Sequence, residues 1–589
     1  MTESSFLWTP QSVVDKFFVQ VPDLIESTAK FVQIPSVSDQ SKAESGAPFG
    51  PDVRKAFELS LDTAKRLGME TYFHPDGTYA WAQIGKGDKR LEIVGHVDVV
   101  SANPSEWQSN PWQLQTVVMP DGQVKFIGRG AFDDKGSFLT TLYAAAQAGG
   151  LLKDDVAVRV VLFGNEETGE WEEVGKYLAR SGNPAVAFVP DAVFPLIAGE
   201  QYIYQLKIDG VGHERESQGD YKTAISINSI STGGNKANQI PAKVELVFSA
   251  YNSNILESLF NRLQNSLGSL VEPGEISNNL VGDRPYSATV VIKGQGGHAS
   301  MPFDGTLNAL QVMALALSTE PATGFVDSPP WRAIRFIQNS LGYDPVGRNF
   351  GFASTDPVTQ GIHTQNIASL EADKDAAHMV LDVRVRNGLN PQVVLDRIKS
   401  EASTHGFEVD KQMVSMAGMM APLDSLPVRA AINAYMKWAG VSANADIIGG
   451  GTFARAFAGT DTIAMAFGMF PPWDGEMMDH KPNEYMTLDA IVLGGLAYME
   501  AILAMGGDPD KIKSMGKSAN PNMSLNVATL LGASLATVAG VGSDLTLELP
   551  FSRMGRVLAN IPPADKYTLE AAQAALDVRA RLTRMDLKK

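Results

Sequence analysis

The chain has 589 residues, of which 44% are hydrophobic and 20% charged, a balance typical of globular proteins and unlike that of disordered ones. Its 49 Lys and Arg against 66 Asp and Glu give a net charge of −17, which argues against nucleic acid or an anionic membrane as the main partner. Cys is absent, so disulfides, thiolate metal sites and cysteine nucleophiles are excluded, and any metal must bind His, Asp or Glu.

The N-terminal residues, MTESSFLWTPQSVV, lack a basic stretch followed by an apolar one, so we expect no secretory signal and predict a cytoplasmic enzyme. Helical spacing of apolar residues follows at 11–33 and 53–68. From there strands alternate with helices: strands are expected at 91–95, 156–163 and 185–189, and helices at 137–148 and 172–181. This alternation predicts an α/β domain with a central, mostly parallel sheet flanked by helices.

The pattern changes near residue 200 and changes back near 417. Between these points the predicted strands are 202–208, 223–228, 243–250, 286–293, 378–386 and 407–414, and the predicted helices are 253–264, 307–318 and 391–405. These predict an inserted α+β lid domain of two sheet-plus-helix halves. The α/β pattern then resumes with helix 428–439, strand 462–467 and helix 487–505.

We therefore expect a catalytic domain formed by residues 1–200 and 418–510, a lid domain at 201–417 and a C-terminal extension at 511–589. In the extension we expect a helix at 569–584. The apolar stretch 525–541 is shorter than the ~20 residues that a membrane-spanning helix needs, so we expect a buried helix there.

Polar side chains are concentrated in five short segments, which are GHVD at 95–98, GRGAFDDKG at 128–136, NEETG at 165–169, PD at 190–191 and DHKPNE at 479–484. Taken singly, such residues are more often helix caps, solvated acids or packed histidines. Three of the segments directly follow apolar strands, however, so their acids should meet at one edge of the sheet.

Several carboxylates cannot stay ionised together at such an edge without a cation. His side chains nearby supply the neutral ligands that zinc, cobalt or manganese accept. Two divalent ions would balance three carboxylates and a hydroxide, so the charge balance favours a pair of metals, at the spacing of about 3.5–4 Å usual for two-metal sites.

The segments GHVDVV, GRGAFDDKG, NEETG, PDAVFP and HKPNE, together with GGHAS and GGGTFAR, resemble the M20 family of metallopeptidases, and within it the PepV-like dipeptidases, over about residues 15–505. The resemblance implies that the metal ligands are His96, Asp133, Glu167, Asp191 and His480, with Asp133 bridging the two ions. It implies a cis peptide bond after Asp133.

The resemblance also implies roles for residues beside the ligands. Glu166 is expected to be the general base that takes a proton from water, and Asp98 to orient the imidazole of His96. Asp134 is not expected to be a ligand. In the lid, His298 is expected to stabilise the tetrahedral oxyanion and Asn238 to contact the substrate.

Arg384 matches the family arginine that binds the C-terminal carboxylate of the substrate. Arg386 stands where the family usually has Pro, so it could share or take over that role. The loop with Gly450, Gly451 and Thr452 is expected to let the backbone approach the substrate. The remaining histidines match no metal position and are expected to be structural; they are His74, His213, His363, His378 and His405.

The resemblance implies a hydrolase that cleaves dipeptides or short peptides with free termini, using two divalent ions, with zinc as the first expectation and cobalt or manganese as alternatives. An acylamino-acid deacylase or a carboxypeptidase on the same site remains open. A non-catalytic binding protein is less favoured because every ligand position is filled. The doubled lid favours a monomer, and a homodimer remains open.

Overall fold

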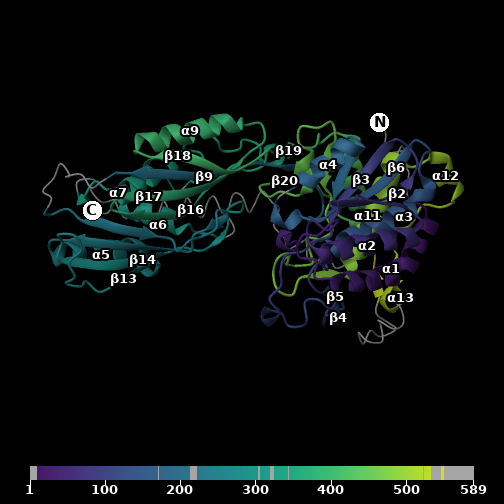
Figure 1. Ribbon diagram of the computed structural model, residues 1–589, viewed down its shortest axis with the longest axis horizontal. Helices are drawn as coiled ribbons and strands as arrows, with labels where there is room; N and C mark the ends of the chain where they lie inside the picture. The colour runs from purple at the N-terminus through teal and green to yellow at the C-terminus, as the bar shows by residue number, and fades with distance from the viewer. Residues whose placement is uncertain are drawn as a thin grey trace. The chain divides into compact units, whose positions relative to one another are not determined.

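The computed structural model describes residues 9–169, 171–212, 222–302, 305–318, 324–342, 344–475, 477–521, 523–531 and 546–548 (Figure 1). The described residues divide into two compact units. The larger unit comprises those up to Glu200, Met419–Asp446 and those from Gly451 onward. The inserted unit comprises Gln201–Gly418 and Ile447–Gly450.

The larger unit contains a sheet with helices packed on it. Its helices are α1 (Gln11–Val32), α2 (Pro51–Arg66), α3 (Lys135–Ala148), α4 (Glu172–Ser181), α10 (Leu426–Ala439), α11 (Leu488–Gly506), α12 (Pro509–Ser514) and α13 (Val527–Leu531). Its sheet strands are β1 (Glu70–Phe73), β2 (Tyr79–Gly85), β3 (Lys89–His96), β6 (Val156–Phe163), β7 (Val186–Val189), β8 (Ile197–Glu200), β19 (Met419–Met420) and β21 (Ile463–Ala466). Smaller sheets contain β4 (Gln115–Val118), β5 (Val124–Ile127), β22 (Tyr485–Thr487), β23 (Ser524–Asn526) and β24 (Thr546–Glu548).

The strand order of the main sheet is β1-β2-β6-β3-β7-β21-β8-β19. Its centre, β6-β3-β7-β21, is parallel, and the strands on either side are antiparallel. The central strands are almost wholly buried runs of Val, Ile, Leu and Phe, as expected for a sheet covered on both faces. The predicted α/β fold class is therefore confirmed, with the parallel part confined to the centre of the sheet.

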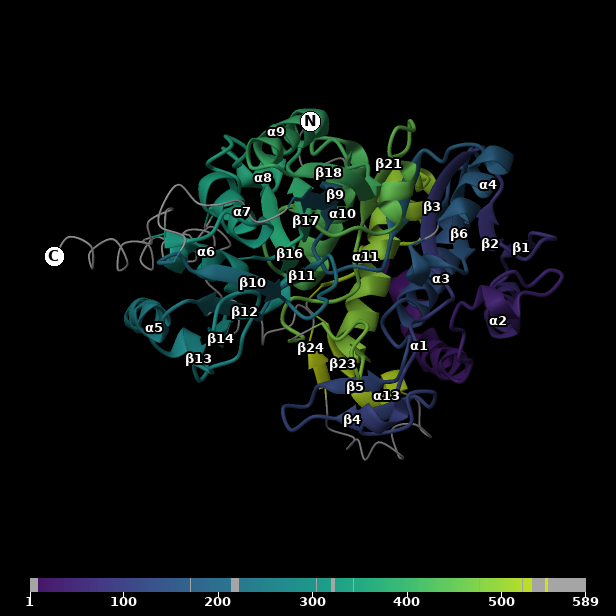
Figure 2. The same ribbon diagram turned by 60° about the vertical axis from the view of Figure 1, so that its left-hand side comes forward.

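Helix α3 packs on β3 and β6, and α11 packs against α1, α3 and α10 (Figures 1 and 2). The side chain of Thr487 accepts the Ala490 N–H and so begins α11 at Leu488. By length and composition α11 could cross a membrane, but 89% of its apolar window is buried within the protein, as in a core helix.

The inserted unit contains one long antiparallel sheet with the strand order β13-β14-β12-β10-β16-β17-β9-β18. The strands are β9 (Tyr202–Val211), β10 (Ser226–Ser231), β12 (Lys243–Ala250), β13 (Val271–Pro273), β14 (Tyr286–Lys293), β16 (Thr364–Asp373), β17 (Ala376–Val385) and β18 (Glu408–Met416). A small separate ladder pairs β11 (Gln239–Ile240) with β15 (Gly297–His298). The helices are α5 (Ser253–Leu267), α6 (Ala309–Leu317), α7 (Pro329–Phe336), α8 (Pro357–Gln360) and α9 (Pro391–Thr404), and β20 (Asp446–Ile448) lies where the two units meet in the sequence.

Helices α5 and α6 pack on β12 and β14, whereas α7 packs on β16 and β17 and α9 packs on β18 (Figure 2). The two predicted sheet-plus-helix halves therefore share one continuous sheet, which joins them through β10 and β16. Buried residues such as Leu246, Val290 and Leu381 form a single core between this sheet and its helices.

The prediction of a helix at 525–541 is wrong for its first two residues. Ser524–Asn526 form a strand that pairs with β24, and α13 begins only at Val527. The side chain of Asn526 accepts the Thr529 N–H, which starts the helix there and leaves the preceding residues extended. Residues 532–541 and the helix expected at 569–584 lie outside the described residues.

Candidate metal centre

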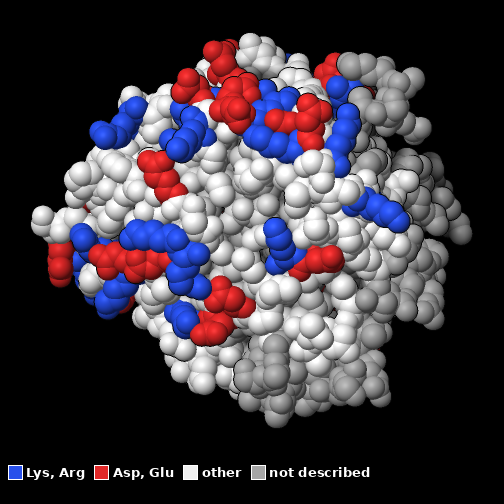
Figure 3. All heavy atoms as spheres, turned by 90° about the vertical axis from the view of Figure 1, so that its right-hand side faces the viewer, with Lys and Arg blue, Asp and Glu red and all other residues white. Residues whose placement is uncertain are grey.

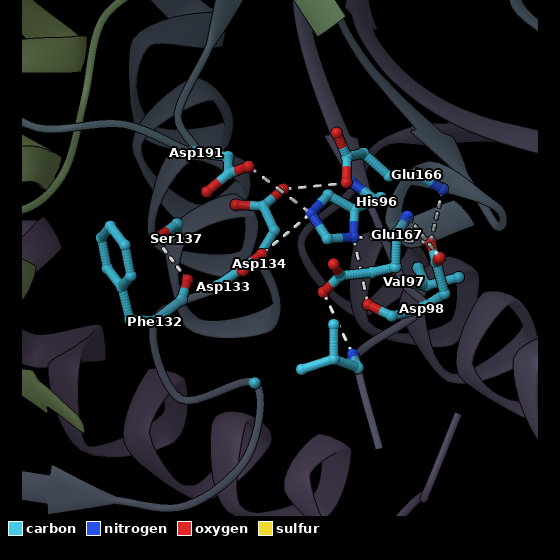
Figure 4. Close-up of polar contacts among 12 residues, drawn as sticks. His96, Val97, Asp98, Phe132, Asp133, Asp134, Ser137, Glu166, Glu167 and Asp191 are labelled. Atoms are coloured by element: carbon cyan, nitrogen blue, oxygen red, sulfur yellow. Dashed lines mark hydrogen bonds and ion pairs between the residues drawn. The ribbon is translucent and has the colours of Figure 1, made fainter. Parts of the chain in front are cut away.

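The candidate site lies at the carboxyl ends of the parallel strands in the larger unit. His96 is the last residue of β3, Glu166 and Glu167 follow β6, and Asp191 follows β7. Because these strands run in the same direction, the residues after them meet at one edge of the sheet (Figure 4). Asp133 reaches the same edge from the loop before α3.

Two groups of metal-ligand atoms share Asp133. In the first group, His96 Nε2 lies 3.1 Å from Asp133 Oδ1 and 3.8 Å from Asp191 Oδ2 (Figure 4). In the second, His480 Nε2 lies 3.1 Å from Asp133 Oδ2 and 2.9 Å from Glu167 Oε2. Asp133 thus presents one carboxylate oxygen to each group, which is the geometry of a bridging ligand.

The charges and unmet polar atoms of these groups fit bound cations. Within the described part of the chain, His96 Nε2 and Asp133 Oδ1 are buried and make no hydrogen bond outside their ligand group. Burial and neighbouring negative charge raise the pKa of Glu167 to about 7 and also raise the pKa of Asp191. Hydrogen bonds that the His480 ring donates to the carboxylates of Asp133 and Glu167 raise the pKa of His480 to about 11. The cluster therefore demands positive charge, and its His and carboxylate donors are the set that zinc, cobalt or manganese accept.

Asp98 lies beside Nδ1 of the His96 ring and also contacts the loop after β6. The backbone carbonyl of Asp98 lies 3.1 Å from His96 Nδ1, whereas its carboxylate lies at 3.4 Å. That carboxylate instead accepts the backbone N–H groups of Glu166 and Glu167, at 3.2 and 3.1 Å. Asp98 thus connects the His96 side chain with the loop that carries both glutamates.

Asp134 belongs to neither ligand group. It is fully buried and accepts the backbone N–H of His96 at 3.0 Å, which ties the start of α3 to the end of β3. The expected cis peptide bond between Asp133 and Asp134 is present.

Glu166 lies beside the ligand groups without belonging to either (Figure 4). Burial, followed by the negative charges of Asp191, Glu167 and Asp133, raises its pKa well above the usual value, while His96 lowers it. A carboxyl whose pKa responds to its neighbours in this way is suited to accepting and returning a proton.

Three residues of the inserted unit that were expected to act on the substrate, Asn238, His298 and Arg384, have defined local contacts. Asn238 Nδ2 lies 3.4 Å from His298 Nε2. Arg384 donates from Nε and Nη2 to the two oxygens of Asp382, at 2.7 and 2.9 Å, and from Nη1 to the Gly449 carbonyl at 2.6 Å. These contacts use three of its five N–H groups and leave donors for a ligand.

The protonation of His298 is set by its neighbour. The backbone N–H of Ser300 donates to His298 Nδ1 at 3.2 Å, which favours the neutral tautomer that carries its hydrogen on Nε2, the atom facing the Asn238 amide. Desolvation and the charge of Arg384 lower the pKa of His298, which keeps the imidazole neutral at neutral pH. His298 therefore offers a neutral Nε2–H donor.

Arg386 makes different contacts from Arg384. Its Nε donates to the Phe352 carbonyl at 2.9 Å, and its Nη1 donates to the carbonyl of Asn387. These contacts attach the guanidinium to the neighbouring loop.

The glycine-rich loop is anchored beyond its last glycine. Thr452 donates from its backbone N–H and its hydroxyl to Glu200, at 3.0 and 2.8 Å. Gly450 and Gly451 precede this anchor. At Gly449 a Cβ atom would lie only 2.9 Å from Ser300 Cβ, so the backbone there needs glycine for the close approach.

The other histidines have local contacts outside the two ligand groups. His74 contacts Asp76, His378 contacts Asp209 and His405 contacts Asn339, while His363 is buried against Phe352. His213 lies outside the described residues.

Sequence reasoning gave no role to Glu484 and Lys135. Lys135 is fully buried and donates to the carbonyls of Phe31 and Ile34. Glu484 is fully buried against the Asp133 loop. Both lie inside polar segments singled out from the sequence, so a charged residue near an expected ligand was the available signal. That these side chains are buried is visible only in the structure.

On the face shown in Figure 3, acidic and basic side chains lie beside one another in small groups. The ion pairs of the larger unit include Lys30–Glu26, Arg54–Glu58 and Arg66–Asp23.

A cluster of His and carboxylate groups at the carboxyl edge of a partly parallel sheet is an arrangement suited to binding divalent metal ions. The model of peptidase family M20/M25/M40 matches residues 93–504, so the chain belongs to this family and is a peptidase, as its sequence predicted.

The matches to one relative and two solved structures each cover most of this chain and nearly all of the other protein. The Beta-Ala-Xaa dipeptidase of Lactobacillus delbrueckii subsp. lactis is 28% identical over 502 residues, which cover 83% of this chain and 97% of that protein. Human carnosine dipeptidase 1 has a TM-score of 0.48 at 15% identity and covers 84% of this chain and 99% of its own. The aminoacylhistidine dipeptidase of Vibrio alginolyticus has a TM-score of 0.48 at 13% identity, covering 83% and 97%.

Proposed function

We propose that this protein is a dipeptidase that uses two divalent metal ions, zinc in the first place, to hydrolyse dipeptides or short peptides with free termini. The observation that carries the proposal is the pair of ligand groups that share Asp133 in a chain of this peptidase family. The L. delbrueckii relative, which this chain matches over nearly its whole length, is named a dipeptidase, and that name supports the substrate class.

His96, Asp133 and Asp191 would hold one ion, and Asp133, Glu167 and His480 the other. Bound divalent ions lower the pKa of water and polarise the scissile carbonyl. Glu166 takes the proton from the attacking water and later delivers it to the leaving amine. Its place outside both ligand groups, with a raised pKa, supports this role.

The inserted unit supplies groups that recognise the rest of the substrate. His298 donates from Nε2 to the developing oxyanion, a role supported by the tautomer that the Ser300 N–H favours. Arg384 binds the C-terminal carboxylate through the N–H groups that Asp382 and Gly449 do not use, and Asn238 assists beside His298. Gly450, Gly451 and Thr452 provide backbone close to the substrate.

A dipeptide library tests the proposal directly. The purified chain is assayed with added zinc, cobalt or manganese against free dipeptides and against the same dipeptides with an acetylated N-terminus. We expect cleavage of the free dipeptides. Cleavage of only the acetylated set would instead indicate an acylamino-acid deacylase, and cleavage of neither set with any metal would contradict the proposal.

A further inference from the structure

Glu484 lies at the centre of a hydrogen-bonded cradle. Its side chain is fully buried, and each carboxylate oxygen has two donors. Oε1 accepts the backbone N–H groups of Phe132 and Asp133, at 2.9 and 3.0 Å. Oε2 accepts the backbone N–H of Gly130 at 3.1 Å and Arg129 Nη1 at 2.6 Å. The carboxylate is therefore fully satisfied and fixed in one orientation.

This cradle joins two loops that both carry candidate metal ligands. One loop leads to Asp133, and the other contains His480, four residues before Glu484. The backbone N–H of Gly128 donates to the Glu484 carbonyl at 3.0 Å, and Arg129 Nη2 reaches the Lys481 carbonyl at 3.4 Å. The loops are thus held together by contacts from the side chain and from the backbone.

The position of Asp133 relative to His480 depends on these contacts. The two side chains approach to 3.1 Å, and Glu484 holds the backbone of Asp133 directly. Both groups share Asp133, but in the first group the other two ligands, His96 at the end of β3 and Asp191 after β7, are placed by the sheet, so this group depends less on the cradle. His480, in contrast, lies in a loop and has a left-handed backbone with φ 58°.

We propose that Glu484, together with Arg129, is a positioning residue for the metal centre. It sets the separation of Asp133 and His480 and so raises the affinity for the ion that these two residues hold with Glu167. The inference rests on the proposed two-metal centre. Residues that orient metal ligands typically change metal affinity 10- to 100-fold when they are replaced.

Glu484→Gln is the sharpest test because it preserves shape. The amide nitrogen replaces one carboxylate oxygen and faces two N–H donors that then lose their acceptor. Metal-free protein is titrated with zinc by calorimetry, without substrate. We expect one of the two ions to bind about 10- to 100-fold more weakly and the other to change much less.

Glu500→Gln is the matched control. Glu500 is also a buried carboxylate of the larger unit, and it accepts the backbone N–H and hydroxyl of Thr9 and the Lys437 ammonium. None of these partners belongs to the loops that carry Asp133 and His480. This variant should lose stability in thermal unfolding and keep both zinc affinities.

Unchanged zinc affinities in Glu484→Gln would overturn the inference, as would equal weakening of both ions. If Glu484→Gln does not fold, Arg129→Lys replaces it, because Lys keeps the charge but cannot contact Glu484 and the Lys481 carbonyl together. The same ion should then bind more weakly, and unchanged binding would again overturn the inference. If the unmodified chain binds none of zinc, cobalt and manganese, the proposed function itself fails, which is a separate result.

Discussion

Replacing Arg384 by Lys tests whether this residue recognises the C-terminal carboxylate of the substrate. Lys keeps the positive charge but cannot donate to Asp382 and a second carboxylate in the geometry of a guanidinium. Asp382 keeps its hydrogen bond from Gln205, at 3.0 Å, so the buried acid is not left without a donor.

The magnitude follows from the donors that remain. With three N–H groups used by Asp382 and Gly449, Arg384 can offer two to a carboxylate. Loss of one charge-assisted hydrogen bond costs about 1.5–3 kcal/mol. At about 1.4 kcal/mol for each factor of ten, kcat/KM for a free dipeptide should fall about 10- to 150-fold.

The assay compares a dipeptide with its C-terminal amide, which lacks the carboxylate. Arg384→Lys should lose activity on the free acid and change little on the amide, so that the preference for the acid disappears. Arg386→Lys is the matched control, and we expect it to keep the preference because Arg386 donates to the carbonyls of Phe352 and Asn387. Equal losses on acid and amide, or a loss of the preference in Arg386→Lys alone, would refute the reasoning.

Three further predictions concern single residues. Glu166→Gln should lower kcat about 10²- to 10⁴-fold while metal content measured by elemental analysis stays unchanged; full activity would exclude Glu166 as the base. His298→Ala should lower kcat about 10²- to 10³-fold, again with unchanged metal content, and a change in KM alone would contradict a role at the oxyanion. Burial lowers the pKa of His363 to about 3, so below pH 6.5 the unfolded state binds a proton that the folded state does not, and stability falls as the pH falls. At pH 5 this costs about 2 kcal/mol, and His363→Gln should remove that part of the pH dependence in urea unfolding; parallel curves for the two proteins would count against it.

The sequence predicts best those elements whose pattern is set by burial. Strand 156–163 and helix 172–181 coincide with β6 and α4, because a run of apolar residues and an amphipathic repeat leave little choice of structure. Strands β1 and β2 and helix α7 were not predicted, since the short edge strand β1, its neighbour β2 and a short helix that begins with two Pro residues carry weak periodicity.

At the site, the sequence predicts which residues gather, because the ends of β3, β6 and β7 are marked by an abrupt change from apolar to polar and charged residues. It does not reveal which partner each polar group chooses. The Asp98 carboxylate binds the N–H groups of Glu166 and Glu167, and Glu484 binds the Asp133 loop, through backbone contacts that leave no mark in the sequence.

The central claim is that five side chains of the larger unit hold two divalent ions with Asp133 between them. Anomalous diffraction at the zinc edge, from crystals grown with zinc, tests this most directly. We expect two peaks, one in contact with His96 and Asp191 and the other with Glu167 and His480, both in contact with Asp133. A single peak, or zinc bound away from these side chains, would contradict the account.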